Sequence, residues 1–556
     1  MKQHVIILLS LIGSFCFGQD YLLHEYTTGG SDAIYGKRNV VVDNNGNIYA
    51  TGLYNNTFEI QDSVVTGGGI YLAKFDNDLS LIWLKKVAEI MGADAGGSLS
   101  GLKLMISIDN DNNVVIGYSA WGGSFLTYDD TIVIQTNNVE LIKLDSAGTR
   151  LWRTSIAGSQ RLGDKGVAVA GQNNILVTGK DLNDDAFITK YDEFGNEIWY
   201  NTAGVSGSGK TDVGTVVTAD NDNNIYTAGM LYSIGSADTA YFGSYQIIFP
   251  ISCFSLSYLA KYTSGGTLEW VRYVYSSNPT IHNAYGSSTI TTIECFENDN
   301  ILVGGYFTNQ LLEFSDGTTS LTKQGNIGFR SSFLASFDTS GNRLWAKTLH
   351  NTTDGSIHIV DLSIDNTSSV YLLNEYWGTI VNEQGNTTTG GSTDLLLERY
   401  DETGNLISSM GMGGNSNDFG YDIVTYDNSV FTYSTTGSQG GTPFYIGADS
   451  LEFSEGYSNN MVLLKLIENP ALGVPENKPE RTIDIFPNPN NGVFTILVPK
   501  ENTELSIYDT SGKIIYKTTV QNAEIFNMDI QNVINGIYFL NIKSKQFNIT
   551  KKVIKI

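Results

Sequence analysis

The fold of this chain is decided by the stretch Val40-Val-Val-Asp-Asn-Asn-Gly-Asn-Ile-Tyr-Ala-Thr-Gly52, which is followed by Tyr71-Leu-Ala-Lys-Phe-Asp76 and by Leu81-Ile-Trp83. The chain contains seven copies of this pattern. Aligned on the lysine of the second phrase, the copies place these residues at one position: Lys74, Lys143, Lys190, Lys261, Ser336, Arg399 and Lys465. Subtraction gives spacings of 69, 47, 71, 75, 63 and 66 residues. Such spacing indicates a fixed unit with loops of variable length.

Each copy predicts four strands joined by hairpins. In the fourth copy the apolar runs are Val216-Val217, Asn224–Gly229, Tyr258–Tyr262 and the run around Trp270. Turn residues such as Asn45-Gly46 separate strands one and two, and a glycine separates strands three and four. The runs are nearly continuous rather than alternating, which suits strands covered on both faces by neighbouring blades. We therefore expect an all-β fold, a seven-bladed β-propeller.

The seventh copy has no fourth strand after Leu463–Leu466. The N-terminal stretch Asp20–Gly30 has the character of that strand, because it is similar to Trp152–Gly158 in the second copy. A closed ring leaves only short protected edges, whereas an open array of repeats needs capping repeats. We therefore expect the N-terminal strand to complete the last blade.

The segment Asp185-Ala-Phe-Ile-Thr-Lys-Tyr-Asp-Glu-Phe-Gly-Asn-Glu-Ile-Trp199 resembles the SBBP β-propeller repeats of secreted bacterial proteins, and the resemblance extends over residues 20–468. Ser336 and Ser408 depart from the pattern, in place of lysine and tryptophan. The pattern also resembles quinoprotein dehydrogenase propellers, but the adjacent cysteine pair and the fuller tryptophan-docking motif of that family are missing. The resemblance implies a secreted propeller, residues 19–468.

The N-terminus has the character of a secretory signal peptide. Met1-Lys-Gln-His is followed by the apolar stretch Val5–Ile12 and by Gly18, so residues 1–18 are predicted to be removed. A lipoprotein would use Cys16, but Phe15 stands where a small residue is expected. No other stretch reaches the length of about eighteen apolar residues that a membrane span needs. We therefore predict no transmembrane segment.

A second domain follows a proline-rich linker, residues 469–481. Residues 482–556 contain Asp484-Ile-Phe-Pro-Asn-Pro-Asn-Asn-Gly492, Leu505-Ser-Ile-Tyr-Asp-Thr-Ser-Gly-Lys513, Asn535-Gly-Ile-Tyr538 and a basic end, Lys551–Ile556. In order and spacing these motifs resemble the type A C-terminal sorting domain of type IX secretion cargo in Bacteroidetes. An ordinary adhesive sandwich module is the other interpretation.

The resemblance to the sorting domain implies a small β-sandwich that interacts with the type IX secretion machinery and carries the protein from the periplasm to the outer cell surface or the medium. The residues that match the family's motifs are expected to form the sorting signal: Pro487, Asn488, Pro489, Gly492, Gly512, Lys513, Gly536 and Tyr538.

The charge of the chain is concentrated in the repeats. Residues 482–556 hold eight lysines against six acidic residues, a net charge of +2, so the remainder of the chain carries −25 − 2 = −27. A field of this sign disfavours binding to nucleic acid and to anionic lipid.

Gly204-Val-Ser-Gly-Ser-Gly-Lys-Thr211 matches the phosphate-binding loop of nucleotide-binding proteins. That loop needs a strand before it and a helix after it. The residues that follow, Asp212–Asp220, instead form the first strand of the fourth copy. We therefore expect no nucleotide site at Lys210.

Asp109-Asn-Asp-Asn-Asn113 and Asp220-Asn-Asp-Asn-Asn224 place oxygen atoms as the start of a calcium loop does. The bidentate acid at loop position twelve is replaced by Ala120 and Leu231. Hairpin turns that use Asp and Asn for local backbone bonds are the favoured interpretation, and calcium is the alternative.

The other chemistry-bearing residues show no known pattern. His24, His282, His350 and His358 form no pair at metal spacing, and a Gly-x-Ser-x-Gly motif is missing. Cys253 and Cys295 could pair after export, although the first-strand position of Cys295 favours a free thiol. We predict no catalytic, cofactor-binding or metal-binding residues.

The expected function is therefore binding, adhesion or scaffolding towards an extracellular ligand such as a glycan or a protein. A propeller-based glycoside hydrolase or polysaccharide lyase is the alternative. A ring of acids with raised pKa in a central funnel would favour the enzyme, whereas exposed aromatic patches on one face would favour binding.

Overall fold

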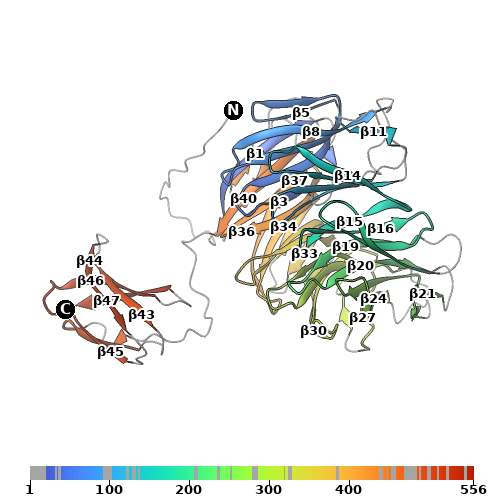
Figure 1. Ribbon diagram of the computed structural model, residues 1–556. Helices are drawn as coiled ribbons and strands as arrows, with labels where there is room; N and C mark the ends of the chain where they lie inside the picture. The colour runs from blue at the N-terminus through green and yellow to red at the C-terminus, as the bar shows by residue number, and fades with distance from the viewer. Residues whose placement is uncertain are drawn as a thin grey trace. The chain divides into compact units, whose positions relative to one another are not determined.

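The chain is built of β-strands in its computed structural model (Figure 1). The structure describes residues 21–31, 34–35, 39–54, 56–91, 103–119, 124–127, 133–134, 138–205, 211–233, 238–250, 253–277, 286–317, 320–323, 328–352, 354–382, 387–437, 443–447, 449–451, 459–468, 485–486, 490–497, 502–509, 513–520, 525–543 and 548–555. Every regular element among these residues is a strand, which confirms the all-β prediction, and none of them lies in a helix able to span a bilayer. The predicted signal peptide and linker lie outside the described residues.

The chain divides into two compact parts, Met1–Leu472 and Gly473–Ile556, called here the larger and the smaller part. The larger part contains seven groups of four antiparallel strands, which we call units one to seven. In each unit the first strand is hydrogen-bonded to the second, the second to the third, and the third to the fourth, as the repeat predicts.

The strands of the units have the following bounds. Units one and two are β3 (Val40–Val42), β4 (Ile48–Tyr54), β7 (Gly69–Phe75) and β8 (Leu81–Met91), then β9 (Lys103–Ile108), β10 (Val114–Ser119), β13 (Val139–Leu144) and β14 (Arg150–Ile156). Units three and four are β15 (Ser159–Ala170), β16 (Asn174–Asp181), β17 (Ala186–Tyr191) and β18 (Glu197–Val205), then β19 (Val213–Ala219), β20 (Ile225–Tyr232), β23 (Ser255–Tyr262) and β24 (Leu268–Ser277). Units five and six are β25 (Ser288–Cys295), β26 (Ile301–Phe307), β29 (Ser331–Phe337) and β30 (Arg343–Thr348), then β32 (Ser356–Ile364), β33 (Val370–Asn382), β34 (Thr387–Tyr400) and β35 (Leu406–Gly413). Unit seven is β36 (Asp418–Tyr426), β37 (Ser429–Thr436), β40 (Asn459–Glu468) and β1 (Tyr21–Ser31).

Unit seven combines the two ends of the larger part. β1 pairs antiparallel with β40 from Tyr21 opposite Glu468 to Ser31 opposite Asn459. The N-terminal strand thus supplies the fourth strand that the seventh copy lacks, and this prediction is confirmed.

The first strands of consecutive units pack side by side, and β36 of unit seven packs against β3 of unit one. Asp361 in unit six accepts hydrogen bonds from Thr292 Oγ1 of unit five at 3.1 Å and from the backbone N–H of Ile423 of unit seven at 3.2 Å. The Val40 N–H of unit one donates to Asp422 of unit seven at 2.8 Å, although 382 positions separate them in the chain. The first strands therefore form a closed cycle of contacts.

Strands inserted between the second and third strands of one unit extend the sheet of the preceding unit. The inserted hairpins are β5–β6 (Thr57–Ile60, Ser63–Thr66), β11–β12 (Ser124–Thr127, Val133–Ile134), β21–β22 (Thr239–Phe242, Tyr245–Ile248), β27–β28 (Leu311–Phe314, Leu321–Thr322) and β38–β39 (Phe444–Ile446, Asp449–Leu451). Their first strands pair with β1, β8, β18, β24 and β35 respectively. In unit six the elongated β33 pairs with β31 (His350–Thr352), which follows the outer strand of unit five. Each insertion thereby ties two units together.

Unit three is the exception, because a short turn, Leu182–Asp185, connects its second and third strands. Among the described residues, no strand extends the outer edge of β14 in unit two. The short spacing between Lys143 and Lys190 in the sequence predicts this missing insertion. A further short strand, β2 (Ile34–Tyr35), pairs with β4.

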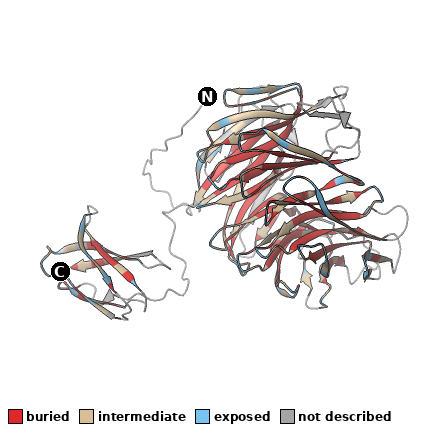
Figure 2. Ribbon diagram, in the orientation of Figure 1, coloured by how far each residue is buried: buried red, intermediate tan, exposed pale blue. Residues whose placement is uncertain are grey.

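The strands in the middle of the units are covered on both faces (Figure 2). Every residue is buried in β4, β10, β13, β17, β23 and β29. The continuous apolar runs of the sequence are thus accounted for, since neighbouring units enclose these strands.

The fourth strand of several units contains a β-bulge just before the tryptophan of the repeat. In unit two, for example, Lys143 pairs with Trp152 and Leu144 pairs with Arg150, so Leu151 is the extra residue. The bulge turns the residue before the repeat tryptophan outward. Ile82, Leu151, Ile198 and Leu344 are therefore 50 to 52% exposed, although they lie in apolar runs.

The smaller part contains two sheets. One consists of β41 (Ile485–Phe486), β42 (Val493–Leu497) and β45 (Ile525–Asp529), and the other of β44 (Ile514–Val520), β43 (Thr503–Tyr508), β46 (Gly536–Lys543) and β47 (Asn548–Lys555). Ile496 and Met528 from the first sheet share one apolar core with Leu505 and Leu540 from the second.

Candidate functional site

The repeat lysines contact the next unit. Their Nζ atoms donate to a backbone carbonyl in the hairpin between the third and fourth strands of that unit, at 2.7 to 3.2 Å, in these pairs: Lys74 to Ser146, Lys143 to Glu193, Lys190 to Ser264, Lys261 to Thr339 and Lys465 to Asn77. The last pair joins unit seven to unit one. The lysine pattern that identifies the repeat therefore serves the contact between units.

The repeat tryptophans contact the same hairpins. Each ring lies against the hairpin glycine of the next unit, in the pairs Trp83–Gly148, Trp152–Gly195, Trp199–Gly266, Trp270–Gly341 and Trp345–Gly404. These glycines have φ between 76° and 86°. A Cβ atom at Gly266 would lie 2.7 Å from the ring of Trp199, so both the backbone angle and the ring require glycine. Tryptophan docking between units is thus present without the fuller motif of the quinoproteins.

The Asp-Asn hairpins use their carboxylates locally. Asp109 Oδ1 accepts the N–H groups of Asp111 at 3.0 Å and Asn113 at 2.7 Å, and Lys143 lies 2.8 Å from Oδ2. Asp220 accepts from the N–H of Asn224 and from the hydroxyl of Tyr226. This geometry agrees with the favoured hairpin interpretation, and calcium stays the untested alternative.

A strand follows the loop that matches the phosphate-binding pattern. β18 ends at Val205 and β19 begins at Val213, while Lys210 lies outside the described residues. Between them, Asp212 accepts the N–H groups of Val205 and Tyr232, each at 2.7 Å. The helix that a nucleotide site requires is replaced by the first strand of unit four, as expected.

The first strands of all seven units line a central cavity of about 290 Å³. Its charged residues are Lys165, Glu294, Asp361 and Asp422. Lys165 and Asp361 form an ion pair across it, with side chains 5% and 8% exposed. Asp361 and Asp422 also accept hydrogen bonds from neighbouring first strands. These carboxylates thus connect the first strands of neighbouring units. Removing one partner of the Lys165–Asp361 pair would leave the other as an uncompensated buried charge.

The carboxyl groups with raised pKa lie apart from this cavity. Burial raises the pKa of Asp418 to about 6. Hydrogen bonds from Thr436 and Gly414 lower this pKa, and the charge of Asp394 makes a smaller contribution that raises it. Asp394 and Asp418 are 7% and 0% exposed, at the junction of units six and seven. Burial also raises the pKa of Glu140, which bonds Ser155 and Arg153 in unit two. Among the described residues, these acids form no ring around the central cavity.

A buried polar cluster joins units five and six. His350 Nε2 lies 2.9 Å from Glu398 Oε1, and both side chains are fully buried. Asn374 and Tyr400 donate to the other carboxylate oxygen at 3.1 and 3.2 Å. This cluster was not predicted from the sequence, although a signal existed. Glu398 stands before Arg399, which is aligned with the repeat lysines, and the other copies have uncharged residues at that position: Ala73, Ile142, Thr189, Ala260, Ala335 and Leu464.

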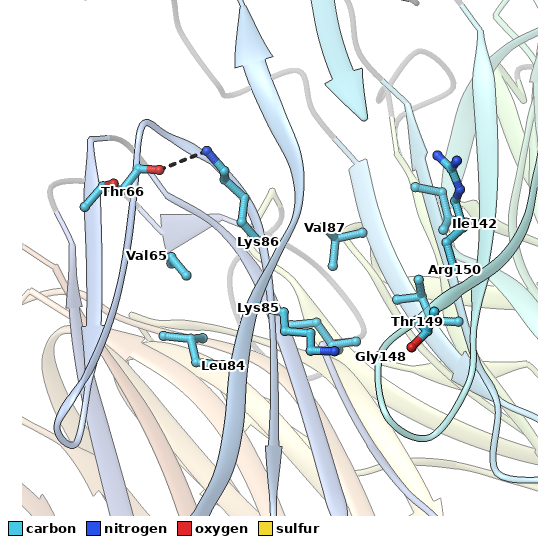
Figure 3. Close-up of a pocket in the computed structure, with 12 residues that line it drawn as sticks. Val65, Thr66, Leu84, Lys85, Lys86, Val87, Ile142, Gly148, Thr149 and Arg150 are labelled. Carbon is cyan, nitrogen blue, oxygen red and sulfur yellow. Dashed lines mark hydrogen bonds between the residues drawn. The ribbon is translucent and has the colours of Figure 1, made fainter. Parts of the chain in front are cut away.

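A larger hollow lies between units one and two, with a volume of about 590 Å³ (Figure 3). We call it the interunit groove. Strand β8 contributes Lys85, Lys86 and Val87, hairpin β5–β6 contributes Val65 and Thr66, and unit two contributes Ile142, Leu144, Gly148, Thr149 and Arg150. Lys86 Nζ donates to the Thr66 carbonyl at 3.1 Å and pairs with Glu89 at 2.9 Å. The volume lies within the range of small-molecule sites.

Two exposed tyrosines, Tyr241 and Tyr245, lie on the β21–β22 hairpin of unit four. Tyr241, Tyr245 and Ile248 are 39%, 42% and 66% exposed. Tyr273 and Tyr275 of β24 are half-buried, and Tyr245 lies close enough to Tyr273 to contribute to its raised pKa, which is due mainly to burial. The register pairs Tyr245 with Phe242 and Tyr241 with Gln246, so Tyr245 lies on the opposite face of the hairpin from Tyr241 and Ile248. We call these five residues, which lie on both faces of the hairpin and on β24, the tyrosine surface. Tyrosine is enriched at binding interfaces because it offers a rigid apolar ring with a polar tip.

Both cysteines outside the signal peptide are free. Burial raises the pKa of the Cys253 thiol to about 12 and raises that of Cys295 well above its usual value. Cys295 lies in β25, the first strand of unit five, as predicted. The free thiols follow the favoured interpretation rather than the disulfide.

Four of the eight expected sorting-signal residues are described. Gly492 has φ of 98°, and a Cβ there would lie 2.8 Å from Gln531 Cα and from Lys555 Cε. The Lys513 N–H donates to Asp509 at 3.0 Å, and the hydroxyl of the buried Tyr538 donates to the Ile534 carbonyl at 2.6 Å. Gly536 opens β46. The other four lie outside the described residues: Pro487, Asn488, Pro489 and Gly512.

Residues 484–556 match the secretion system C-terminal sorting domain. The match indicates export by the type IX secretion machinery to the cell surface or outside the cell. Among curated proteins, an uncharacterized WD repeat-containing protein of Acanthamoeba polyphaga mimivirus is 27% identical over 191 residues. The aligned region makes up 33% of this chain but only 12% of the length of that relative.

Several solved structures show a weak likeness. The polysaccharide lyase Uly1 is 10% identical and has a TM-score of 0.40, covering 82% of this chain and 94% of its own. A member of the DUF4221 family from Bacteroides vulgatus is 8% identical with a TM-score of 0.32, covering 69% of this chain and 99% of its own. The endosialidase of phage phi92 is 10% identical with a TM-score of 0.28, covering 96% and 87%. These scores are too low to define a shared fold or activity.

Proposed function

We propose that this chain is an exported binding, adhesion or scaffolding protein, a seven-bladed β-propeller of SBBP-type repeats followed by a small β-sandwich that acts as its sorting signal. The seven units with one strand order, the β1–β40 pairing and the cycle of first strands support the propeller. The core shared by the two sheets of the smaller part supports the sandwich.

The proposed route has two steps. A signal peptide, residues 1–18, takes the chain to the periplasm, and residues 482–556 then take it through the outer membrane of a Bacteroidetes host. The propeller, residues 19–468, and the linker, residues 469–481, follow as cargo. The sorting-domain match supports this route.

The tyrosine surface is the observation that carries a binding role. Exposed aromatic side chains are the feature expected to favour binding, and two tyrosines of this hairpin, Tyr241 and Tyr245, are exposed. The repeat lysines and tryptophans support the same role, because their contacts between units make a rigid scaffold for such a surface.

An array of extracellular polysaccharides and proteins, probed with the exported chain, tests the proposal. We expect a ligand that binds without being cleaved, and we expect a Tyr241→Ser/Tyr245→Ser variant to lose that binding while keeping its melting temperature. Cleavage of an arrayed polysaccharide would instead establish the glycoside hydrolase or lyase alternative. The absence of any ligand across the array would count against the binding role.

A further inference from the structure

We propose that a surface centred on Arg330 binds a short saccharide that carries carboxylate groups. The inference deepens the proposed function, on which it rests, by naming a second surface and the class of its ligand. It is carried by a guanidinium group that no described residue hydrogen-bonds and that lies among aromatic rings of three units. We call the set the Arg330 surface: Tyr232, Tyr306, Phe329, Arg330, His358 and Trp377.

The members of the Arg330 surface lie at one end of units four, five and six. Tyr232 and Tyr306 lie at the ends of the second strands β20 and β26, and Arg330 directly precedes the third strand β29. In unit six, His358 lies near the start of the first strand β32, and Trp377 pairs with the first residue of that strand. In an antiparallel unit the start of the first strand, the end of the second and the start of the third lie at the same end.

Contacts join these side chains across units five and six. The guanidinium of Arg330 lies over the Tyr306 ring, 4.4 Å from its centre, and the ring of His358 meets the same ring edge to face at 5.8 Å. The rings of Phe329 and Trp377 also meet edge to face, with their centres 5.2 Å apart. Because Phe329 and Arg330 are consecutive in the chain, both sets of contacts belong to one continuous patch.

Tyr232 extends the patch to unit four. Burial raises the pKa of Tyr232, the charges of Tyr306 and Asp212 raise this pKa further, and the charge of Arg161 lowers it. Charges influence one another in this way only over short distances, so Tyr232 lies close to both Tyr306 and Arg161. Arg161 is an exposed residue of unit three, and it adds a second positive charge beside the two tyrosines.

The Arg330 guanidinium is available to a ligand. The residue is half-buried, and within the described part of the chain its hydrogen bonds are made by the backbone: its N–H donates to Ser356 Oγ at 3.0 Å, and its carbonyl accepts from Ile357 at 3.2 Å. A guanidinium that lies over a ring keeps its N–H groups for other partners, and a carboxylate accepts from two of them in parallel. The carboxylate of Glu375 lies 3.4 Å from His358 instead.

The aromatic rings define the rest of the ligand. Trp377 is 39% exposed, and Tyr306 and Phe329 are half-buried. Such rings offer apolar faces, and tyrosine adds a hydroxyl group that donates and accepts hydrogen bonds. A uronic acid matches this combination, because its sugar ring has an apolar face, a rim of hydroxyl groups and one carboxylate. Since the net charge of −25 repels long polyanions, we expect a short oligosaccharide or a chain end.

The test is calorimetric titration of the full exported chain with tetragalacturonate, with its methyl ester and with tetraglutamate. The ester keeps the sugar and loses the charge, whereas the peptide keeps the charge and loses the sugar. Tetragalacturonate should bind about tenfold or more tightly than either of the other probes. Equal binding of the acid and its ester would overturn the inference, and so would tighter binding of the peptide.

Variants assign the two parts of the recognition. Arg330→Gln should reduce the preference for the acid over the ester to about twofold or less, whereas Trp377→Ala should weaken acid and ester alike. Arg272→Gln is the matched control and should keep the preference. The Arg272 guanidinium also lies over a ring, 5.4 Å from the centre of Trp270, but it donates to the Gly341 carbonyl at 2.7 Å. Melting temperatures show whether each variant is folded.

A preference for the acid that persists in Arg330→Gln would overturn the inference. The proposed function can survive that result. If the wild-type chain does not distinguish the acid from the ester, while the ligand found on the array is lost in Tyr241→Ser/Tyr245→Ser, the Arg330 surface is refuted and the binding role stands.

Discussion

Gly266 and Trp199 illustrate how single residues of the repeat hold the units together. The glycine has φ of 86°, and the indole ring of the preceding unit occupies the space of its missing side chain. The Trp199 Nε1 atom donates to the Ser264 carbonyl at 3.2 Å in the same hairpin. One glycine thus satisfies a backbone requirement and a packing requirement at once.

We predict that Gly266→Ala lowers the free energy of unfolding by about 2 to 3 kcal/mol, because it adds a steric clash to a strained backbone. Gly243→Ala is the matched control, since its φ is also positive at 58° but no atom lies within 4 Å of the added Cβ. The Gly243→Ala variant should lose only about 1 kcal/mol of the free energy of unfolding. Denaturant unfolding of both variants provides the comparison, and equal losses would show that the ring contact contributes nothing.

Asp418 gives the chain a pH-dependent stability. Its pKa of about 6 in the folded chain lies above the usual value for Asp of about 4. The folded state therefore binds the proton more tightly than the unfolded state, so the stability linked to Asp418 is present at low pH and is lost as pH rises from about 4 to 6.

The Asp418→Asn variant should consequently raise the free energy of unfolding by about 2 kcal/mol at pH 8. At pH 4 the same substitution should leave the free energy of unfolding almost unchanged. Thermal unfolding across this range measures the effect. In Asp192, burial is outweighed by hydrogen bonds from Asn196 and from backbone N–H groups, so its pKa is lowered. Asp192→Asn should therefore show the opposite sign, a loss at neutral pH. A pH-independent difference between Asp418→Asn and the wild type would contradict the assignment.

At the scale of elements, the decisive contact is the pairing of β1 with β40. It covers the edge of an apolar strand, Leu463–Leu466, that would otherwise offer unpaired backbone groups to other chains. The inserted hairpins act in a similar way on the outer strands of the preceding units.

Deletion of residues 21–30 should expose the β40 edge, lower the melting temperature and promote aggregation. The control is a chain that begins at Tyr21 and keeps β1. Size-exclusion chromatography and thermal unfolding compare the two. A monomer with the melting temperature of the control would show that β1 does not close the larger part.

The sequence predicts much of this architecture and less of the sites. Repetition identifies the four strands of each unit, and the missing fourth strand of the seventh copy predicts the role of β1. Local pattern does not reveal which strand an inserted hairpin will pair with, so the crossing of β21 onto β18 was missed. The cations of the interunit groove were missed for the same reason, because Lys86 and Arg150 belong to different copies and line one hollow only through packing between units.

At the scale of the whole molecule, the chain has two compact parts with different features. The larger part carries the acidic charge, the tyrosine surface and the interunit groove, while the smaller part carries the match to the sorting domain. All seven units and the closing strand lie within Met1–Leu472. We therefore expect the larger part to fold without the smaller one.

The most direct test of the proposed export is the distribution of the chain between periplasm, cell surface and medium in a type IX-competent host, with and without residues 482–556. The truncated chain should fold and remain in the periplasm, whereas the intact chain should reach the surface or the medium. The same tail grafted with its linker onto a signal-bearing reporter should redirect that reporter. A truncated chain that leaves the cell as efficiently as the intact one would contradict the account.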